Sequence, residues 1–197
     1  MRDEGVTKYV CHWHQKGPVI DSGLSQLMEV RDELYGLGWI GEYPDGIGFG
    51  NVSYRLMDDS FVISGTQTGK VEKTTPDHYG RVIRWNLVEN TLTCEGPIQA
   101  SSEGMTHGVI YELSCEIKAV IHIHNDRLWK QSLACFPYTP AEVPYGTPQM
   151  GEAVSQLYKT TDLPYTKIFA MAGHEDGIVA FGGSLIEALD TLKKAFL

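Results

Sequence analysis

The stretch Ala119-Val120-Ile121-His122-Ile123-His124-Asn125 is an apolar run that ends in two histidines one residue apart. A run of this kind is expected to form a buried strand. Because side chains alternate between the two faces of a strand, His122 and His124 point the same way. Two imidazoles so placed can bind one metal ion. An enzyme built on them also needs a third ligand, an open coordination position and a nearby acid or base.

Helical and strand-like patterns alternate along the rest of the chain, as in an α/β protein. One helix is expected to be capped by Ser25 and to carry an apolar stripe of Leu27, Val30, Leu34 and Leu37. Other helices are expected at 103–113, 128–135, 150–158 and after a cap at Ser184. Strands are expected at 9–15, 52–57, 61–64, 82–86, 91–94, 117–123, 166–171 and 177–181.

Loops are expected in the glycine-rich stretch 43–50 and the proline-rich stretch 137–148, and a hairpin turn is expected at Glu89-Asn90. Many of the strands are short and follow one another through turns of this kind. We therefore expect a mainly antiparallel sheet with helices on its faces, formed as a single domain by residues 1–197.

Composition excludes several classes of protein. The 197 residues are 42% hydrophobic and carry a net charge of -9, with no cluster of lysine and arginine to neutralise phosphates, which argues against a nucleic-acid partner. No apolar run reaches the roughly 18 residues of a membrane span, and the charged start Met1–Gly5 lacks a signal sequence. The four cysteines form no CxxC pair and are expected to be reduced thiols. The expected location is cytoplasmic.

His174 is the candidate for the third ligand. It lies in Met171-Ala172-Gly173-His174-Glu175-Asp176-Gly177, directly after a second apolar strand and in a turn bounded by glycines. Such a turn can present a side chain at the edge of a sheet with little steric cost. Three histidines with one open position are the arrangement of a catalytic zinc site, and zinc or another borderline divalent metal is the expected occupant.

Glu103, in Ser101-Ser102-Glu103, has two interpretations. Ser102 can cap the helix that follows, and an acidic residue in the first turn of a helix interacts favourably with the helix dipole. Alternatively, the two hydroxyls and the free amides of a helix N-terminus form an anion site. In that case Glu103 is placed to exchange a proton with a substrate bound at the metal.

Three further motifs carry weaker signals. Gly50-Asn51-Val52-Ser53 and Thr66-Gln67-Thr68-Gly69 offer backbone amides and small polar side chains at strand ends, although each alone is more often a plain turn. Cys11-His12-Trp13-His14 also has alternating histidines, for which exposed strand side chains are the preferred explanation. His78 and His107 have no assigned role, although His107 follows Glu103 by one helical turn.

The order of these motifs resembles that of the class II aldolase/adducin family. The matching pieces are Gly50–Ser53, Thr68-Gly69, Ser101–Glu103, His122-Ile123-His124 and His174, and the resemblance spans roughly residues 25–190. It implies a three-layer αβα domain around a mainly antiparallel sheet, and a homotetramer with its site at a subunit interface.

The resemblance also implies roles for the site residues. His122, His124 and His174 would hold a zinc ion, and Glu103 would be the catalytic acid or base. The residues that would line a phosphate pocket are Asn51, Thr68, Gly69, Ser101 and Ser102.

Three features depart from the family pattern. The third histidine is there followed at once by glycine, whereas Glu175 and Asp176 precede Gly177 here, so either carboxylate is a candidate to join or replace the ligand. The turn Thr66–Gly69 lacks the usual proline. In the sugar-phosphate aldolases, a C-terminal extension supplies a catalytic tyrosine across the subunit interface. We expect no counterpart of it here, and no residue is assigned to the role of that tyrosine.

The function expected from the residues and the resemblance together is that of a metal-dependent, aldolase-like lyase. It would act through the enediolate of a small hydroxy-ketone or sugar, which is expected to be phosphorylated. Epimerisation, dehydration and decarboxylation use the same metal ligands and remain alternatives. A different class of function, a binding module without catalysis as in the adducin branch, needs the fold but not the metal.

Overall fold

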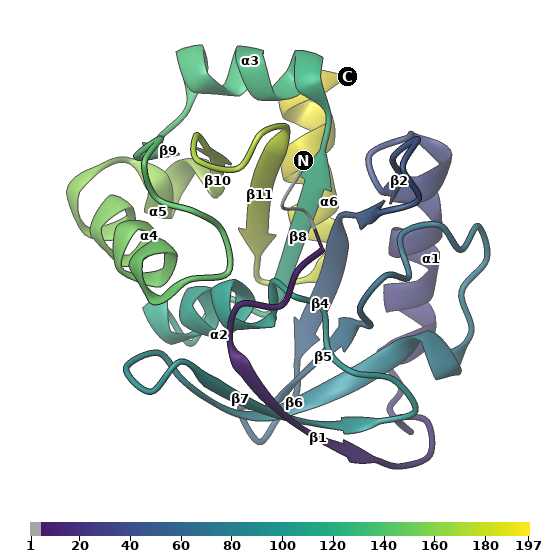
Figure 1. Ribbon diagram of the computed structural model, residues 1–197. Coiled ribbons are helices and arrows are strands. Elements are labelled where there is room, and N and C mark those ends of the chain that lie inside the picture. The colour runs from purple at the N-terminus through teal and green to yellow at the C-terminus, as the bar shows by residue number, and fades with distance from the viewer. Residues whose placement is uncertain (1–4) are drawn as a thin grey trace.

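The predicted apolar strand is the central element of the computed structural model, which describes residues 5–197. It forms β8 (Ala119–His124), and all six of its residues are buried. β8 pairs antiparallel with β4 (Asn51–Arg55) on one side and with β11 (Gly177–Gly182) on the other. The two histidines therefore lie at the end of a strand that is enclosed by neighbours on both sides (Figure 1).

β8 belongs to a sheet of nine strands in the order β1-β7-β6-β5-β4-β8-β11-β10-β9. Only the pairs β1–β7 and β10–β9, at the two edges of the sheet, are parallel. The prediction of a mainly antiparallel sheet is thus confirmed. The remaining strands are β1 (Val10–Gln15), β5 (Phe61–Ser64), β6 (Tyr79–Asn86), β7 (Thr91–Gly96), β9 (Tyr138–Thr139) and β10 (Ile168–Met171).

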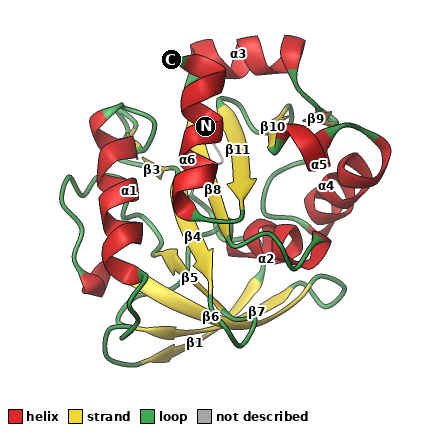
Figure 2. Ribbon diagram, turned by 180° about the vertical axis from the view of Figure 1, so that it is seen from behind, coloured by secondary structure: helices red, strands yellow, loops and turns green. Residues whose placement is uncertain are grey.

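Helices cover both faces of the sheet. α1 (Leu24–Gly36) and α6 (Leu185–Phe196) lie over one face, with α3 (Asp126–Cys135) beyond its end, and α2 (Gly104–Leu113) and α4 (Pro148–Thr160) lie over the other (Figures 1 and 2). The alternation along β8 separates the two cores. Ile121 and Ile123 pack with α1 and α6, whereas Val120 packs with α2 and α4. His122 and His124 lie on the same face as Val120.

Several expected boundaries were wrong. Ser25 lies inside α1, whose N-cap is Gly23, and α2 begins after Glu103, with no side-chain cap from Ser102. Ser184 does cap α6, because its hydroxyl accepts a hydrogen bond from the backbone N–H of Glu187. The expected loops contain two short strands, β3 (Gly48–Phe49) and β9, and β3 pairs with β2 (Gly41–Glu42), which lies just before the first of these loops.

Two short helical segments also escaped prediction, the 3-10 helix Pro76–His78 and α5 (Leu163–Thr166). α5 includes Thr166, where a strand was expected, so β10 begins two residues later. Within residues 5–197, no helix has both the length and the apolar character that crossing a bilayer requires.

Candidate metal centre

The structure brings His122, His124 and His174 together into one buried cluster. One ligand nitrogen from each ring lies within 4.8 Å of the others. The Nε2 atoms of His122 and His124 are 2.8 Å apart, and the ring of His174 lies 5.2 Å and 4.6 Å from the two other rings, measured between centroids. This is the donor set predicted from the sequence, and three imidazoles are suitable ligands for a divalent metal ion.

The turn between β10 and β11 places His174. The backbone N–H of His174 donates to Met171 O, and that of Gly177 donates to His174 O, so the turn is closed at both ends. Gly177 is the register partner of His124. A Cβ at Gly177 would lie 3.1 Å from Cε1 of His122 and 3.0 Å from the backbone oxygen of His174. Glycine at this position therefore gives the two rings the space they occupy.

Burial keeps His122 in the neutral form that binds metals. Desolvation, followed by the proximity of His174 and His107, holds the pKa of His122 well below its ordinary value. Its Nδ1 lies 3.2 Å from Ile178 O. A carbonyl can only accept, so Nδ1 carries the proton and Nε2 directs a lone pair toward the cluster. The residues present therefore fit a metal ion.

Glu103 lies beside this cluster at the start of α2. It is the N-cap of the helix and is 1% exposed. Its Oε1 lies 3.7 Å from Nδ1 of His174. The carboxylate is thus close to one of the histidines and is not exposed at a helix end, where an acidic residue would serve only the helix dipole.

The segment that contains Thr66–Gly69 is joined to the segment that leads into α2. Ser101 donates its backbone N–H to Ser64 O, and Thr66 donates its own to Gln99 O, so the segment after β5 is joined to the segment before α2. Thr68 Oγ1 donates to Gly65 O at 2.8 Å and closes its own turn. The turn that contains Thr68 and Gly69 is therefore held close to the segment that contains Ser101.

Asn51 and Ser53 on β4 have different positions relative to the cluster. Asn51 is the register partner of His122, and its buried Oδ1 has no hydrogen-bond partner among residues 5–197. Ser53 is bonded instead to Nδ1 of His107 and to the hydroxyl of Tyr111, both at 2.7 Å. His107 is buried and is not one of the three converging histidines.

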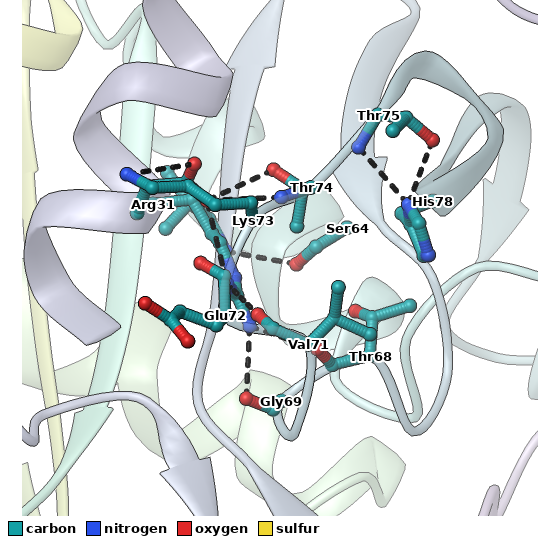
Figure 3. A network of polar contacts seen from close by, with 12 residues as sticks. Arg31, Ser64, Thr68, Gly69, Val71, Glu72, Lys73, Thr74, Thr75 and His78 are labelled. Atoms are coloured by element: carbon teal, nitrogen blue, oxygen red, sulfur yellow. Dashed lines mark hydrogen bonds and ion pairs between the residues drawn. The ribbon is translucent and has the colours of Figure 1, made fainter. Parts of the chain in front are cut away.

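Arg31 of α1 holds the Thr68-Gly69 turn from behind, a role that the sequence interpretation missed (Figure 3). Its Nη2 donates to the backbone oxygens of Thr68 and Gly69 at 2.8 Å each, and its Nη1 donates to those of Val71 and Glu72. Arg31 is 1% exposed. The available signal was its place in the apolar stripe of α1, where a surface arginine does not belong.

Two tyrosines that were not predicted also contact the cluster. Tyr145, from the proline-rich loop, stacks on His174 with ring centroids 4.3 Å apart. Tyr43, from the expected loop 43–50, places its hydroxyl 2.8 Å from Nδ1 of His124. Their spacing in the sequence carries no signal of these contacts. His12 and His14 are exposed on the edge strand β1, as expected.

Comparison with known proteins agrees with the fold and with the family that the sequence resembles. The model of the family described as "Class II Aldolase and Adducin N-terminal domain" matches residues 25–194. A 3-oxo-tetronate 4-phosphate decarboxylase from Haemophilus influenzae is 26% identical over 171 aligned residues, which cover 75% of this chain and 73% of the relative.

Solved structures share the architecture at low sequence identity. The l-fuculose-1-phosphate aldolase from Thermus thermophilus has a TM-score of 0.63 at 19% identity, with 87% of each chain covered. The sugar-phosphate aldolase from Thermotoga maritima has a TM-score of 0.64 at 16% identity, covering 86% of this chain and 88% of that one. At these identities the likeness concerns the fold alone.

Proposed function

The chain belongs to the class II aldolase and adducin family, and from this premise we propose that it is a metal-dependent lyase acting on a small phosphorylated hydroxy-ketone. The observation that carries the proposal is the buried convergence of His122, His124 and His174, with Glu103 at 3.7 Å from His174. A module that used only the fold for binding would have no need of this donor set.

The proposed metal is zinc, held by the three histidines. Three imidazoles leave a fourth position for substrate, and imidazole suits zinc among the common divalent metals. When bound, such an ion supplies a Lewis acid that stabilises negative charge on a substrate oxygen. The remaining contributions to the reaction come from side chains and backbone groups of the chain itself.

Glu103 is proposed as the acid or base. Its carboxylate lies beside the cluster and moves the proton on the carbon that reacts, while its backbone forms the N-cap of α2. A group fixed by a helix keeps its position through the reaction, which favours proton transfer at a defined atom.

The phosphate of the substrate is proposed to bind between the Thr68-Gly69 turn and the segment Ser101-Ser102 that leads into α2. The residues proposed to line this pocket are Asn51 on β4, Thr68 and Gly69 in the segment after β5, and Ser101 and Ser102 before α2. Two observations support the pocket, namely the pairing of Asn51 with His122 and the backbone bonds that join the last two segments. Arg31 is not proposed to contact the phosphate. It binds the carbonyl oxygens of Thr68 and Gly69 on one side of the turn, and the anion is proposed to bind on the other side, away from these oxygens. Binding at a remote phosphate orients the reacting end of the substrate.

Decarboxylation is the second candidate reaction. It is favoured by the relative from Haemophilus influenzae, whose name is that of a decarboxylase of a phosphorylated 3-oxo acid. Loss of carbon dioxide and aldol cleavage both break the bond between the α-carbon of a ketone and the next carbon, and both leave the same kind of enediolate on the remaining ketone when the α-carbon carries a hydroxyl. The same site residues therefore serve either reaction, and the substrate decides between them.

The assembly is proposed to be a homotetramer, as the family resemblance implies. The measurement is light scattering coupled to size-exclusion chromatography. A mass near that of one chain under conditions of full zinc loading would contradict this part of the proposal.

The test of the function begins with metal analysis of the purified protein and of a His122→Ala/His124→Ala variant. We expect about one zinc ion per chain in the wild type and loss of the ion in the variant. The zinc-loaded wild type is then supplied with a ketose 1-phosphate, to detect aldol cleavage, and with a 3-oxo acid phosphate, to detect release of carbon dioxide.

Glu103→Gln is the matched variant, because glutamine keeps the shape of the side chain and removes its ability to exchange a proton. It should retain zinc and lose turnover. A wild-type protein that neither contains nor accepts zinc would contradict the lyase proposal and favour the binding module. Full turnover in Glu103→Gln would contradict only the role given to Glu103.

A further inference from the structure

The outer side of His124 is held by a tyrosine and a carboxylate from two separate segments. The hydroxyl of Tyr43 lies 2.8 Å from Nδ1 of His124 and donates to Oδ2 of Asp176 at 3.4 Å. Asp176 is buried, with 6% of its surface exposed, and belongs to the two-residue step Glu175-Asp176 that separates His174 from Gly177. The arrangement is a chain of three polar groups, directed away from the histidine cluster.

The direction of these hydrogen bonds follows from the group at their outer end. A carboxylate only accepts, so the hydroxyl of Tyr43 donates to Asp176 and its oxygen accepts from Nδ1–H of His124. The proton on Nδ1 leaves the lone pair of Nε2 facing the cluster, 2.8 Å from Nε2 of His122. Since His122 is fixed in the same tautomer by Ile178 O, two lone pairs face each other, and a shared cation removes their repulsion.

We propose that Tyr43 and Asp176 are positioning residues of the metal centre, which fix the ring and the tautomer of His124 and increase its affinity for the metal. The proposal rests on the proposed function, because it requires that His124 be a ligand. It also gives a role to Asp176, one of the two acidic residues that separate His174 from Gly177. Asp176 acts from behind His124, and neither Asp176 nor the exposed Glu175 belongs to the converging donor set.

The backbone holds both positioning residues in place. Asp176 has φ 70°, in the left-handed region, and its carbonyl accepts the backbone N–H of Asn125, the residue that follows His124. This bond continues the β8–β11 pairing past the last strand residue. The bond from Asn125 to Asp176 therefore holds Asp176 next to the end of β8, the strand that carries His122 and His124.

Tyr43 is fixed from the other side by the turn between β2 and β3. Its backbone N–H donates to Ile47 O, and its carbonyl accepts from Gly46 N–H. Phe49, on β3, packs against both Tyr43 and His124, with ring centroids at 4.6 Å and 5.6 Å. The hydroxyl of Tyr43 is therefore directed at His124 by an element with its own internal hydrogen bonds.

The expected effect follows from the behaviour of histidine ligands. A ligand whose outer N–H is bonded toward a carboxylate is oriented and made more basic, and loss of such a partner reduces metal affinity by about 10- to 100-fold. Tyr43→Phe removes the bridging hydroxyl and keeps the ring that packs against Phe49. Asp176→Asn removes the charge and keeps a residue that tolerates the left-handed backbone.

The experiment measures the zinc affinity of the full chain by competition with a chromophoric chelator, using Zn²⁺ alone as the probe. We expect at least tenfold weaker binding in Tyr43→Phe and in Asp176→Asn. The double variant should be no weaker than the weaker single variant, because the two residues act through one another. The visible absorption of bound Co²⁺ should change in the same variants, since it reports the ligand field of His124.

Tyr54→Phe is the matched control. It removes a tyrosine hydroxyl that donates to another carboxylate, that of Asp21 at 2.7 Å, on the opposite face of the sheet. It should leave zinc affinity and the Co²⁺ spectrum unchanged. Thermal unfolding of the metal-free variants verifies that each has folded.

Three results would contradict the proposal, each in a different way. Wild-type affinity and an unchanged Co²⁺ spectrum in Tyr43→Phe would overturn the inference alone. Loss of zinc in Asp176→Asn with full retention in Tyr43→Phe would make Asp176 a ligand, contrary to the role assigned here. Absence of zinc binding in the wild type itself would overturn the proposed function, and the inference with it.

Discussion

Gly177 and His122 are in contact across neighbouring strands, such that a Cβ on Gly177 would lie 3.1 Å from Cε1 of the imidazole. Gly177→Ala should therefore displace the ring or the turn. Overpacking of a buried site costs about 1–3 kcal/mol. If that strain falls on the ligands, zinc affinity should decrease roughly tenfold or more, as measured by chelator competition.

Gly36→Ala is the control for this substitution, because a Cβ at Gly36 has no atom within 4 Å. It lies at the end of α1 and should leave zinc affinity unchanged. Equal affinities in Gly177→Ala and the wild type would mean that the turn adapts without moving a ligand.

The second prediction concerns Arg31. Arg31→Leu leaves the buried backbone oxygens of Thr68 and Gly69 without their donors, and a buried group without a partner costs about 1–3 kcal/mol. We expect the free energy of unfolding to fall by about 2–4 kcal/mol and the KM for a phosphorylated substrate to rise. Urea unfolding and steady-state kinetics are the measurements.

Arg84, which is exposed on β6, offers the comparison. Arg84→Leu should change the free energy of unfolding by no more than about 0.5 kcal/mol. If the KM for the phosphorylated substrate is the same in Arg31→Leu as in the wild type, the Thr68-Gly69 turn does not contribute to anion binding.

The third prediction is a dependence of stability on pH. Burial lowers the pKa of His107 from its ordinary value of 6.5 to about 3. Between these values the unfolded chain binds a proton that the folded chain does not, so stability is lost as the pH falls. Each such histidine lowers the free energy of unfolding by about 1.4 kcal/mol per pH unit in that window.

His107→Gln should remove this contribution and reduce the slope by about 1.4 kcal/mol per pH unit. Urea unfolding of the metal-free protein between about pH 6 and pH 4.5 gives the change in the free energy of unfolding per pH unit. This change can be compared between the two proteins even if their absolute stabilities differ. An identical slope in the two proteins would contradict the assignment.

The fourth prediction concerns the thiols of Cys11 and Cys94, whose sulfur atoms are 3.7 Å apart. The hydrogen bond from Cys94 lowers the pKa of Cys11 to about 7, against the opposing effect of burial. The rate at which iodoacetamide modifies Cys11, followed by mass spectrometry, should rise through pH 7. In Cys94→Ala the rise should occur at higher pH, and a rise at the same pH would exclude Cys94 as the cause.

The predictable part of the site was encoded within short stretches of sequence. The alternation of His122 and His124 at the end of an apolar run depends only on strand geometry, and it was enough to place both rings on one face. His174 required one further step, because the apolar strand before its turn, β10, is joined to β8 only through β11, the strand that follows the turn. The family resemblance joined these local signals into one site.

The parts that escaped prediction depend on contacts between distant segments. Arg31 bonds to oxygens 37 to 41 residues away, and Tyr43 reaches a histidine 81 residues away. Neither distance is encoded in a local pattern. The wrong boundaries have a simpler cause, since Ser25 and Ser102 were each one of several polar residues able to cap the helix that follows.

The pairing of β8 with β11 also determines how fast a bound ion would exchange with the solution. Two of the three proposed ligands lie on a strand that is hydrogen-bonded on both sides, and the third lies on the turn that closes the β10–β11 hairpin. Of these, the turn can open by breaking its own two closing bonds and the bond from Asn125 to Asp176, while the β4–β8 pairing stays intact. We therefore expect release of a bound ion to require opening of residues 172–176, so that the rate of metal exchange should report the motion of that turn.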